Sequence, residues 1–387
     1  PMLVRALEEA KKIDDGPVIV HALTTKGKGF PNPERNYYAY HATGPFDPKT
    51  GKAVKTSAAP APTYTKVFGE TLCELMEADD RIVAITAAMP DGTGIDMALE
   101  RHPERSFDVG IAEQHAVTFA AGMACEGMKP VAAIYSTFLQ RGFDQLIHDV
   151  CLQDLNVTFG MDRAGIVGAD GPTHHGLLDI AYLRGYPNIV LMAPKDEGEL
   201  RDMMHTAIEH PGPAALRYPR GNGIGVEITA KPRLIEIGKG EIVREGEDVA
   251  IIAYGSMVMP SLDAARSLEA DGINATVVNA RFVKPLDEAL LTEIAETHRL
   301  VITVEEAYLA GGFGSAVLEL YEHKNLLEGL RVVRMGVPDR IVTHGDAKLL
   351  LAKYGLDADG IHQKVKQTLA EIPASKKNLR TRLRAVK

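Results

Sequence analysis

Short apolar runs alternate with stretches of helical periodicity from Tyr64 onward. The first series of runs lies at Arg81–Thr86, Phe107–Ile111, Val131–Tyr135, Val157–Met161, Ile189–Ala193 and Ala214–Tyr218. A second series follows at Val249–Gly255, Ala275–Asn279, Leu300–Val304 and Arg331–Met335. Buried strands separated by helices are typical of parallel sheets covered on both faces. We therefore predict an α/β protein with two doubly wound αβ domains.

The first 62 residues follow a different pattern. Met2–Lys12 predicts an amphipathic helix and Pro17–Leu23 a short strand, followed by a stretch rich in Pro, Tyr and Gly. Ser57–Thr63 has the composition of a linker, and a second break falls at about Ile228–Gly240. These breaks predict three parts: residues 1–62 as the remnant of a third domain, 63–228 as one αβ domain and 229–387 as the other.

Composition narrows the class of protein. The 43 Lys and Arg residues face 52 Asp and Glu residues, a formal net charge of -9 that argues against a nucleic-acid partner. No apolar stretch is long enough to cross a membrane. Cys73, Cys125 and Cys151 lie in apolar helical patterns, which predicts reduced core residues of an intracellular protein. We expect a cytoplasmic location, or the plastid stroma in a eukaryote.

Several polar motifs follow predicted strands directly. Tyr135, Phe138 and Arg141 follow one strand, and a glycine-rich loop with Arg163, Asp170, His174 and His175 follows the next. Ligands of open α/β sheets gather at the carboxyl ends of the strands, and glycines let the backbone wrap closely around them. Taken singly, Phe138 is better explained as a core residue and Arg141 as a surface residue. Adjacent histidines rarely converge on one ion, so no metal site is predicted.

Three further segments are ambiguous when taken alone. Glu113 lies between a strand and the apolar helix Ala116–Ala124, where a surface glutamate would stabilise the helix dipole. Arg217, Tyr218 and Arg220 predict a phosphate clamp, with surface arginines at a linker as the alternative. Lys26 stands in KGKG without the helix start of a P-loop, and Gly311–Ser315 lacks the spacing of a dinucleotide fingerprint.

In combination, GIAEQHA, YSTFLQR and GADGPTH (which include Glu113, Tyr135 to Arg141 and Gly168 to His174) resemble the thiamine-diphosphate transketolase superfamily. RYPRGN, Arg217–Asn222, resembles its deoxyxylulose-phosphate synthase branch. The resemblance extends from about Met2 to about Ala370. It implies a transferase that uses thiamine diphosphate and Mg²⁺ to join pyruvate to D-glyceraldehyde 3-phosphate. The product would be 1-deoxy-D-xylulose 5-phosphate, which opens the non-mevalonate isoprenoid pathway and also supplies thiamine biosynthesis.

The resemblance also implies residue roles. Glu113 would hold N1′ of the aminopyrimidine, Phe138 would stack on that ring, and Lys26 would approach the diphosphate. His41 and His174 would act at the reacting centre. The substrates would be bound by Tyr135, Arg141, Arg163, Asp170, His174 and Arg220, with Arg163 and Arg220 on the acceptor phosphate. A homodimer is expected.

The superfamily's metal-binding motif, Gly-Asp-Gly followed by Asn, does not occur in this sequence. We therefore expect no metal ligands here and a C-terminal portion that works with an N-terminal fragment of the same enzyme. Transketolase proper and a 2-oxoacid dehydrogenase E1 β-type subunit are alternatives within the enzyme class. From another class, a non-catalytic dimer-forming subunit is the alternative.

Overall fold

The computed structural model describes residues 1–36, 40, 45–52, 54 and 61–372, which fall into two compact units, residues 1–59 and 60–387. The first unit contains the helices α1 (Met2–Ala10) and α2 (Pro31–Arg35). Residues 17–23 adopt no strand, so that prediction is wrong. A strand needs a hydrogen-bonding neighbour, and the described residues of this unit supply none for it.

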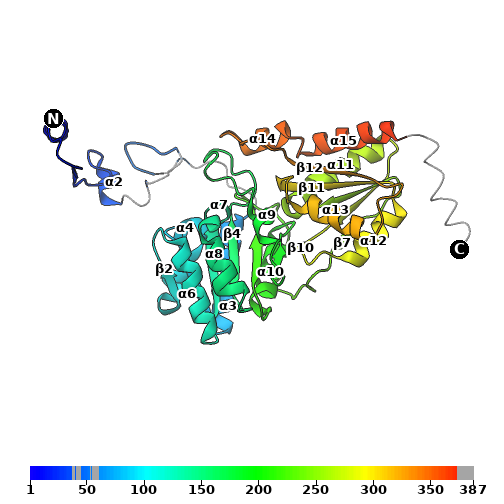
Figure 1. The fold of residues 1–387 in the computed structure, drawn as a ribbon, viewed down its shortest axis with the longest axis horizontal. Coiled ribbons are helices and arrows are strands. Elements are labelled where there is room, and N and C mark those ends of the chain that lie inside the picture. The colour runs from blue at the N-terminus through cyan, green and yellow to red at the C-terminus, as the bar shows by residue number, and fades with distance from the viewer. Residues whose placement is uncertain (37–39, 41–44, 53, 55–60, 373–387) are drawn as a thin grey trace, which may run out of the picture. The chain divides into compact units, whose positions relative to one another are not determined.

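The second unit begins with a seven-stranded sheet in the order β10-β5-β6-β4-β3-β1-β2 (Figure 1). Its first six strands along the chain are parallel. Their bounds are β1 Ile82–Thr86, β2 Ser106–Asp108, β3 Lys129–Tyr135, β4 Thr158–Asp162, β5 Val190–Met192 and β6 Ala214–Arg217. The connecting helices are α3 Tyr64–Ala78, α4 Pro90–Thr93, α5 Ile95–Arg101, α6 Glu113–Cys125, α7 Ser136–Leu139, α8 Phe143–Gln145, α9 Asp179–Leu183 and α10 Glu197–Glu209.

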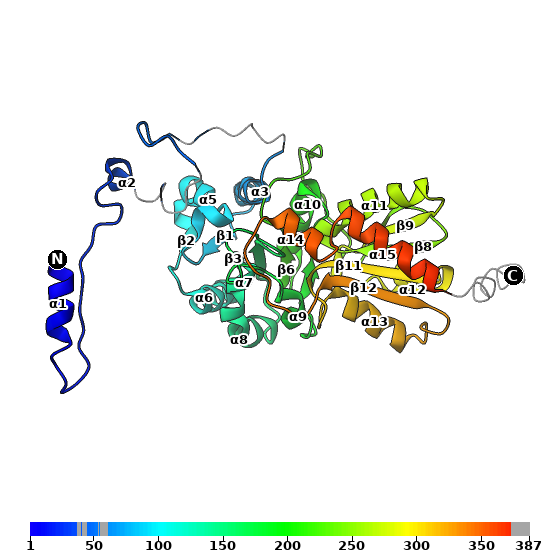
Figure 2. The same ribbon diagram turned by 90° about the horizontal axis from the view of Figure 1, so that it is seen from above.

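Helices cover both faces of this sheet, as the near-continuous apolar strands require. Viewed from above, α3, α5 and α10 lie on one side of the strands and α6, α7 and α8 on the other (Figure 2). Phe68 of α3 and Met203 of α10 belong to the core on the first side, and Val117 of α6 to the core on the second. The helices cover the faces of the sheet, so the residues at the carboxyl ends of its strands are covered mainly by loops.

The second sheet has five strands in the order β12-β11-β8-β9-β7. The strands are β7 Glu241–Arg244, β8 Val249–Ala253, β9 Ala275–Asn279, β11 Leu300–Tyr308 and β12 Arg331–Val337. Its helices are α11 Val258–Ala270, α12 Glu288–Thr297, α13 Phe313–His323, α14 Ala347–Lys353 and α15 Ala358–Glu371. With these two largely parallel sheets, the structure confirms the predicted α/β fold class.

Two antiparallel strands were not predicted. β7 pairs with β9 at the edge of the second sheet, and β10 (Phe282–Lys284) pairs with β5 in the first sheet. Both are short and carry charged residues, which is typical of edge strands and weakens the apolar signal. Because β10 follows β9 along the chain, the later αβ series completes the earlier sheet.

The structure bears on the predictions about membrane-spanning segments and about the cysteines. No helix among residues 1–36, 40, 45–52, 54 and 61–372 is long and apolar enough to span a membrane. Cys73 and Cys151 are buried, but Cys125 is exposed at the end of α6, so its prediction as a core residue is wrong. Cys125 is the last residue of the helix, and Glu126 and Gly127 after it are exposed as well.

Candidate active site

Most of the predicted site residues lie at the carboxyl ends of adjacent strands. Tyr135 ends β3, Arg163 follows β4 and Arg220 follows β6, and these three strands are neighbours in the sheet. Parallel strands place their carboxyl ends at one edge, which is where ligands bind in such sheets. Glu113, Phe138, Arg141, Asp170 and His174 complete one continuous set of contacts with these residues.

Glu113 is the first residue of α6, and only 4% of its side chain is exposed. A carboxylate at this position interacts favourably with the helix N-terminus. The Nη1 atom of Arg141 lies 3.5 Å from Glu113 Oε2, and the Arg141 side chain is 54% exposed. Gly142 allows this approach, because a side chain there would press against Val117 and the Glu113 carbonyl. The buried glutamate is thus paired with an arginine side chain that is itself half exposed to solvent.

Aromatic rings continue the cluster from Arg141. The Arg141 guanidinium lies 6.0 Å from the centre of the Phe138 ring, and Tyr135 stacks on Phe138 at 5.7 Å and 15°. The Arg163 guanidinium lies over the Tyr135 ring, 4.2 Å from its centre. Tyr135 is only 3% exposed, and burial raises the pKa of its hydroxyl to about 12. In this structure Tyr135 supports Arg163 and Phe138, and its contact with substrate stays a prediction.

Two arginines, Arg163 and Arg220, converge on the carboxylate of Asp170 in the glycine-rich loop that follows β4. Arg163 Nη1 donates to Asp170 Oδ2 at 2.7 Å, and Arg220 Nη1 donates to the same oxygen at 2.8 Å. Arg163 has a backbone φ of +62°, a left-handed conformation that is strained for a residue with a side chain. That conformation turns its guanidinium toward both Tyr135 and Asp170. Both predicted phosphate ligands therefore already share a carboxylate.

The two adjacent histidines have different surroundings. His174 packs edge-on against Phe138 at 5.3 Å and has Nδ1 2.9 Å from Thr173 Oγ1. His175 is buried: the Val167 N–H donates to its Nδ1 at 3.1 Å, and its Nε2 lies 3.2 Å from the Thr343 carbonyl. These partners require a neutral ring with the proton on Nε2, and burial lowers the His175 pKa. His174 therefore belongs to the cluster, and His175 holds the loop.

The predicted Arg217–Tyr218–Arg220 clamp does not form. Arg217 is buried and its Nε donates to Asp179 Oδ2 at 2.9 Å, while Tyr218 is fully buried and stacks on Phe68. Consecutive residues of a strand point to opposite faces of the sheet, and both faces of this sheet are covered, so both side chains are buried. Only Arg220 reaches the loop.

The two predicted residues of the first unit cannot be assessed with the others. Lys26 lies at a turn of that unit, and each unit is described by itself. His41 lies outside the described residues. Their roles stay predictions.

Three acidic residues near the cluster were not predicted. Asp162 ends β4 beside Arg163, is fully buried, and accepts a hydrogen bond from Thr65 Oγ1 at 2.7 Å, while Oδ1 has no partner among the described residues. Burial raises its pKa to about 7. Glu305 and Glu306 are buried near the end of β11. Two adjacent carboxylates inside the apolar run VITVEEAY were the sequence signal for this pair.

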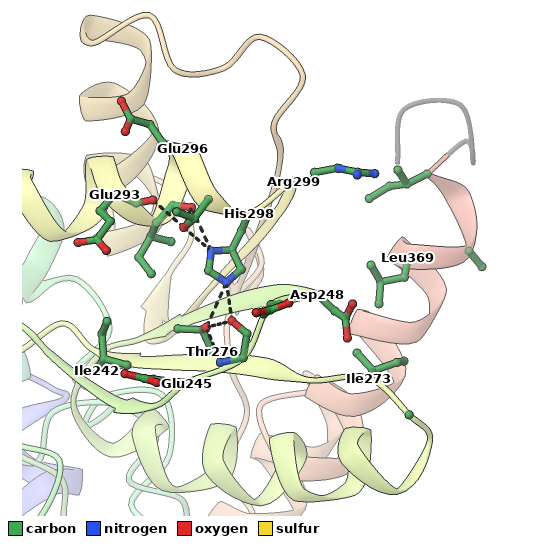
Figure 3. A pocket seen from close by; sticks show the side chains of 17 residues that line it. Ile242, Glu245, Asp248, Ile273, Thr276, Glu293, Glu296, His298, Arg299 and Leu369 are labelled. Atoms are coloured by element: carbon green, nitrogen blue, oxygen red, sulfur yellow. Dashed lines mark hydrogen bonds between the residues drawn. The ribbon is translucent and has the colours of Figure 1, made fainter. Parts of the chain in front are cut away.

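A cavity of about 910 Å³ lies elsewhere, at the amino edge of the second sheet (Figure 3). Asp248, Ile273 and Arg299, which line it, each precede a strand of that sheet. The imidazole of His298 points toward Thr276, with Nε2 3.1 Å from Thr276 Oγ1 and Nδ1 3.2 Å from the Ile294 carbonyl (Figure 3). Both ring nitrogens thus have protein partners, and none of the predicted site residues lines this cavity.

The cluster is compatible with the pyrimidine ring of the cofactor that the sequence implies. A buried carboxylate beside a half-buried aromatic ring, Glu113 and Phe138, can hold a flat heteroaromatic ring by one hydrogen bond and by stacking. Among the residues that the structure describes, no group of three His, Cys, Asp or Glu side chains could hold a metal ion. The geometry is therefore compatible with an aminopyrimidine ring, and the roles of Glu113 and Phe138 toward it stay predictions.

Comparisons with known proteins give the family of the two domains. Residues 60–224 match the family described as "Transketolase, pyrimidine binding domain", and residues 238–361 match "Transketolase, C-terminal domain". The chain is 56% identical to 1-deoxy-D-xylulose-5-phosphate synthase 1 of Geobacter sulfurreducens, over 93% of this chain and 56% of that protein. It is 54% identical to the 1-deoxy-D-xylulose-5-phosphate synthase of a Cyanothece strain, over 94% of this chain and 57% of that protein. The chain thus spans somewhat more than half the length of these relatives.

Solved structures give the same family. A split-gene transketolase, described as an inactive β4 tetramer, is 33% identical, with a TM-score of 0.71 over 80% of this chain and 99% of that one. A transketolase from Pichia stipitis, 20% identical with a TM-score of 0.65 over 83% of this chain and 48% of that one, shares the fold. The chain therefore belongs to the transketolase family and carries its pyrimidine-binding and C-terminal domains.

Proposed function

We propose that this chain supplies the pyrimidine-binding half of the active site of a 1-deoxy-D-xylulose-5-phosphate synthase. The observation that carries the proposal is the continuous cluster from Glu113 through Phe138 to Arg220, in a chain more than half identical to such synthases. The whole enzyme would join pyruvate to D-glyceraldehyde 3-phosphate with loss of carbon dioxide. Thiamine diphosphate would act as the electron sink, with Mg²⁺ bound at its diphosphate.

The residues of the cluster divide the work by their chemistry. Glu113 would hold N1′ of the aminopyrimidine and move a proton at that atom, and Phe138 would stack on the ring. His174 would hold or accept protons on substrate oxygens. Arg163 and Arg220 would bind the acceptor phosphate, which then competes with Asp170 for both guanidinium groups. Tyr135 and Arg141 would shape the entrance.

We further propose that a polypeptide with the diphosphate- and magnesium-binding half completes the site, with Lys26 and His41 reaching it from the first unit. The support is the exposed apolar surface of that unit. The α1 helix buries none of its residues, and Met2, Ile19 and Leu23 are 88%, 92% and 87% exposed. Apolar side chains in such numbers mark a surface that another chain segment covers.

Assembly and location are proposals of the same kind. We propose a homodimer in the cytoplasm. The homodimer would cover Ile111, an apolar side chain that is 79% exposed just before α6. The free cysteines are in keeping with the reducing environment of the cytoplasm. The split-gene relative is described as an inactive β4 tetramer, and we propose that this chain alone is likewise inactive.

A reconstitution assay tests the proposed function. The chain is mixed with the part of the Geobacter sulfurreducens synthase that lies outside the match, together with thiamine diphosphate, Mg²⁺, pyruvate and D-glyceraldehyde 3-phosphate. Formation of 1-deoxy-D-xylulose 5-phosphate that requires both polypeptides is expected. Formation of a transketolase product from a ketose donor instead, with pyruvate unused, would contradict the proposal.

A further inference from the structure

The loop that carries Asp170 and His174 is rooted in the C-terminal domain. Ile166 near its start and Leu177 just after its end are buried in the same apolar core as Val304 of β11 and Met335 of β12. The loop also exchanges backbone hydrogen bonds with that domain, from the Tyr308 N–H to the Leu177 carbonyl at 3.1 Å and from the Gly345 N–H to the Gly168 carbonyl at 3.2 Å. The loop belongs to one domain by sequence and to the other by packing.

Glu306 makes the side-chain contacts that fix the start of this loop. Its Oε1 accepts the Ile166 N–H at 2.6 Å, and its Oε2 accepts the Ser256 hydroxyl at 2.7 Å. Gly165 makes the approach possible, because any Cβ there would collide with the Glu306 carboxylate. A buried carboxylate is costly unless it is hydrogen-bonded in this way.

The end of the loop is tied to the same residue. Arg217 Nη2 donates to the Glu306 carbonyl at 3.2 Å and to the Gly176 carbonyl at 3.1 Å. Gly165 and Gly176 exchange backbone hydrogen bonds of 2.7 and 2.9 Å, which closes the base of the loop. Glu306 is therefore bonded directly to one strand of the loop base and through Arg217 to the other.

We propose that Glu306 is a positioning residue through which the C-terminal domain sets the substrate loop 165–176. By fixing the base of the loop, it holds Asp170 against Arg163 and Arg220, and His174 against Phe138. The effect on substrate affinity rests on the proposed function, whereas the effect on loop order does not. The C-terminal domain then contributes to the site without touching a ligand.

The neighbouring Glu305 provides a matched control. It lies on the same strand, is likewise buried, and also accepts two hydrogen bonds, here from the backbone N–H groups of Phe313 at 2.6 Å and Gly314 at 2.9 Å. These bonds cap α13 within the C-terminal domain and do not involve the loop. Removing Glu305 should therefore destabilise the domain in the same way while leaving loop 165–176 ordered.

Amide hydrogen exchange on the 387-residue chain separates the two roles. Glu306→Ala should speed exchange of peptides covering 164–176 about tenfold or more, because the Ile166 N–H loses its buried carboxyl acceptor. Glu306→Gln should stay close to wild type, since its amide oxygen can accept from Ile166 while its NH₂ group donates to Ser256. Glu305→Ala should speed exchange at the start of α13 and leave the loop unchanged.

The kinetic consequence is measured in the reconstituted enzyme. Glu306→Ala should raise the KM for D-glyceraldehyde 3-phosphate several-fold more than the KM for pyruvate, and Glu306→Gln should restore it. Equal acceleration of loop exchange by Glu305→Ala and Glu306→Ala, or an unchanged loop in Glu306→Ala, would overturn the proposal. If the wild-type mixture makes no product, the proposed function fails while the exchange data still decide the role of Glu306.

Discussion

Charged side chains lie at the carboxyl edges of both sheets, but they differ in their exposure to solvent. Around the first sheet, the side chains of Arg141, Arg220 and Asp170 are 54%, 43% and 30% exposed. At the second, Glu305 and Glu306 are 0% and 5% exposed, and protein N–H and hydroxyl groups fill their hydrogen-bonding positions. The first edge has charges that a ligand can reach, whereas those of the second are already satisfied.

Topology alone therefore does not tell which edge binds a ligand. Both sheets are mainly parallel and both direct polar residues to the ends of their strands. The difference comes from what covers each edge, because loop 165–176 packs into the second domain at its base and faces the first edge at its tip. Function follows the site and not the fold.

The largest expected effect comes from the first edge. Glu113→Gln should lower turnover of the reconstituted enzyme roughly 10²–10⁴-fold, because an amide cannot exchange the proton that the aminopyrimidine needs. The thermal unfolding temperature should change little. Steady-state formation of 1-deoxy-D-xylulose 5-phosphate measures the effect.

Glu126→Gln, an exposed glutamate at the other end of α6, is the matched control and should keep wild-type turnover. Near-normal turnover in Glu113→Gln would remove the catalytic role of the first edge.

A smaller effect is expected at the mouth of the same edge. Arg220→Ala should raise the KM for D-glyceraldehyde 3-phosphate about ten- to a hundredfold, because a charge-assisted contact to phosphate is lost. The KM for pyruvate should stay near wild type. Arg220→Lys should fall between the two, since it keeps the charge without the planar fork. An equal rise for both substrates would mean that Arg220 serves the architecture through Asp170.

The smallest effect concerns Asp162, a buried carboxyl beneath the first edge. Its folded-state pKa is about 7 against an ordinary value of 3.8. Between these values the folded protein holds a proton that the unfolded chain has released, so this group's contribution to stability falls as pH rises. Asp162→Asn cannot ionise and should gain in unfolding temperature relative to wild type from pH 5 to pH 8. Parallel profiles across that range would contradict the burial argument.

Much of the fold follows from local pattern. The runs that predicted β1, β3, β8 and β9 coincide with the observed strands to within about two residues at each end, because buried strands leave a continuous apolar signal. β7 and β10 were not predicted, because edge strands need no continuous apolar run. Pro17–Leu23 has the signal without a strand, since pairing depends on a neighbour that the pattern cannot supply.

The residues of the cluster were predicted more completely than the residues that hold the loop 165–176 in place. Strand ends and a family resemblance located Phe138, Arg163, Asp170 and Arg220, because each lies close in sequence to a strand of one sheet. Glu306 is 140 residues from the Ile166 N–H that it accepts, and nothing local connects them. The direction of Arg217 was missed for a similar reason, since its partner Asp179 lies 38 residues earlier in the chain.

Titration calorimetry of thiamine diphosphate with Mg²⁺ tests the central claim that this chain carries only the pyrimidine half of the site. The claim predicts weak or no binding to the 387-residue chain alone, because stacking on Phe138 and one hydrogen bond to Glu113 contribute about 1–3 kcal/mol. Tight binding should follow when the part of the Geobacter sulfurreducens synthase outside the match is added, and it should weaken with Glu113→Ala. Tight binding to the chain alone, unaffected by Glu113→Ala, would contradict the claim.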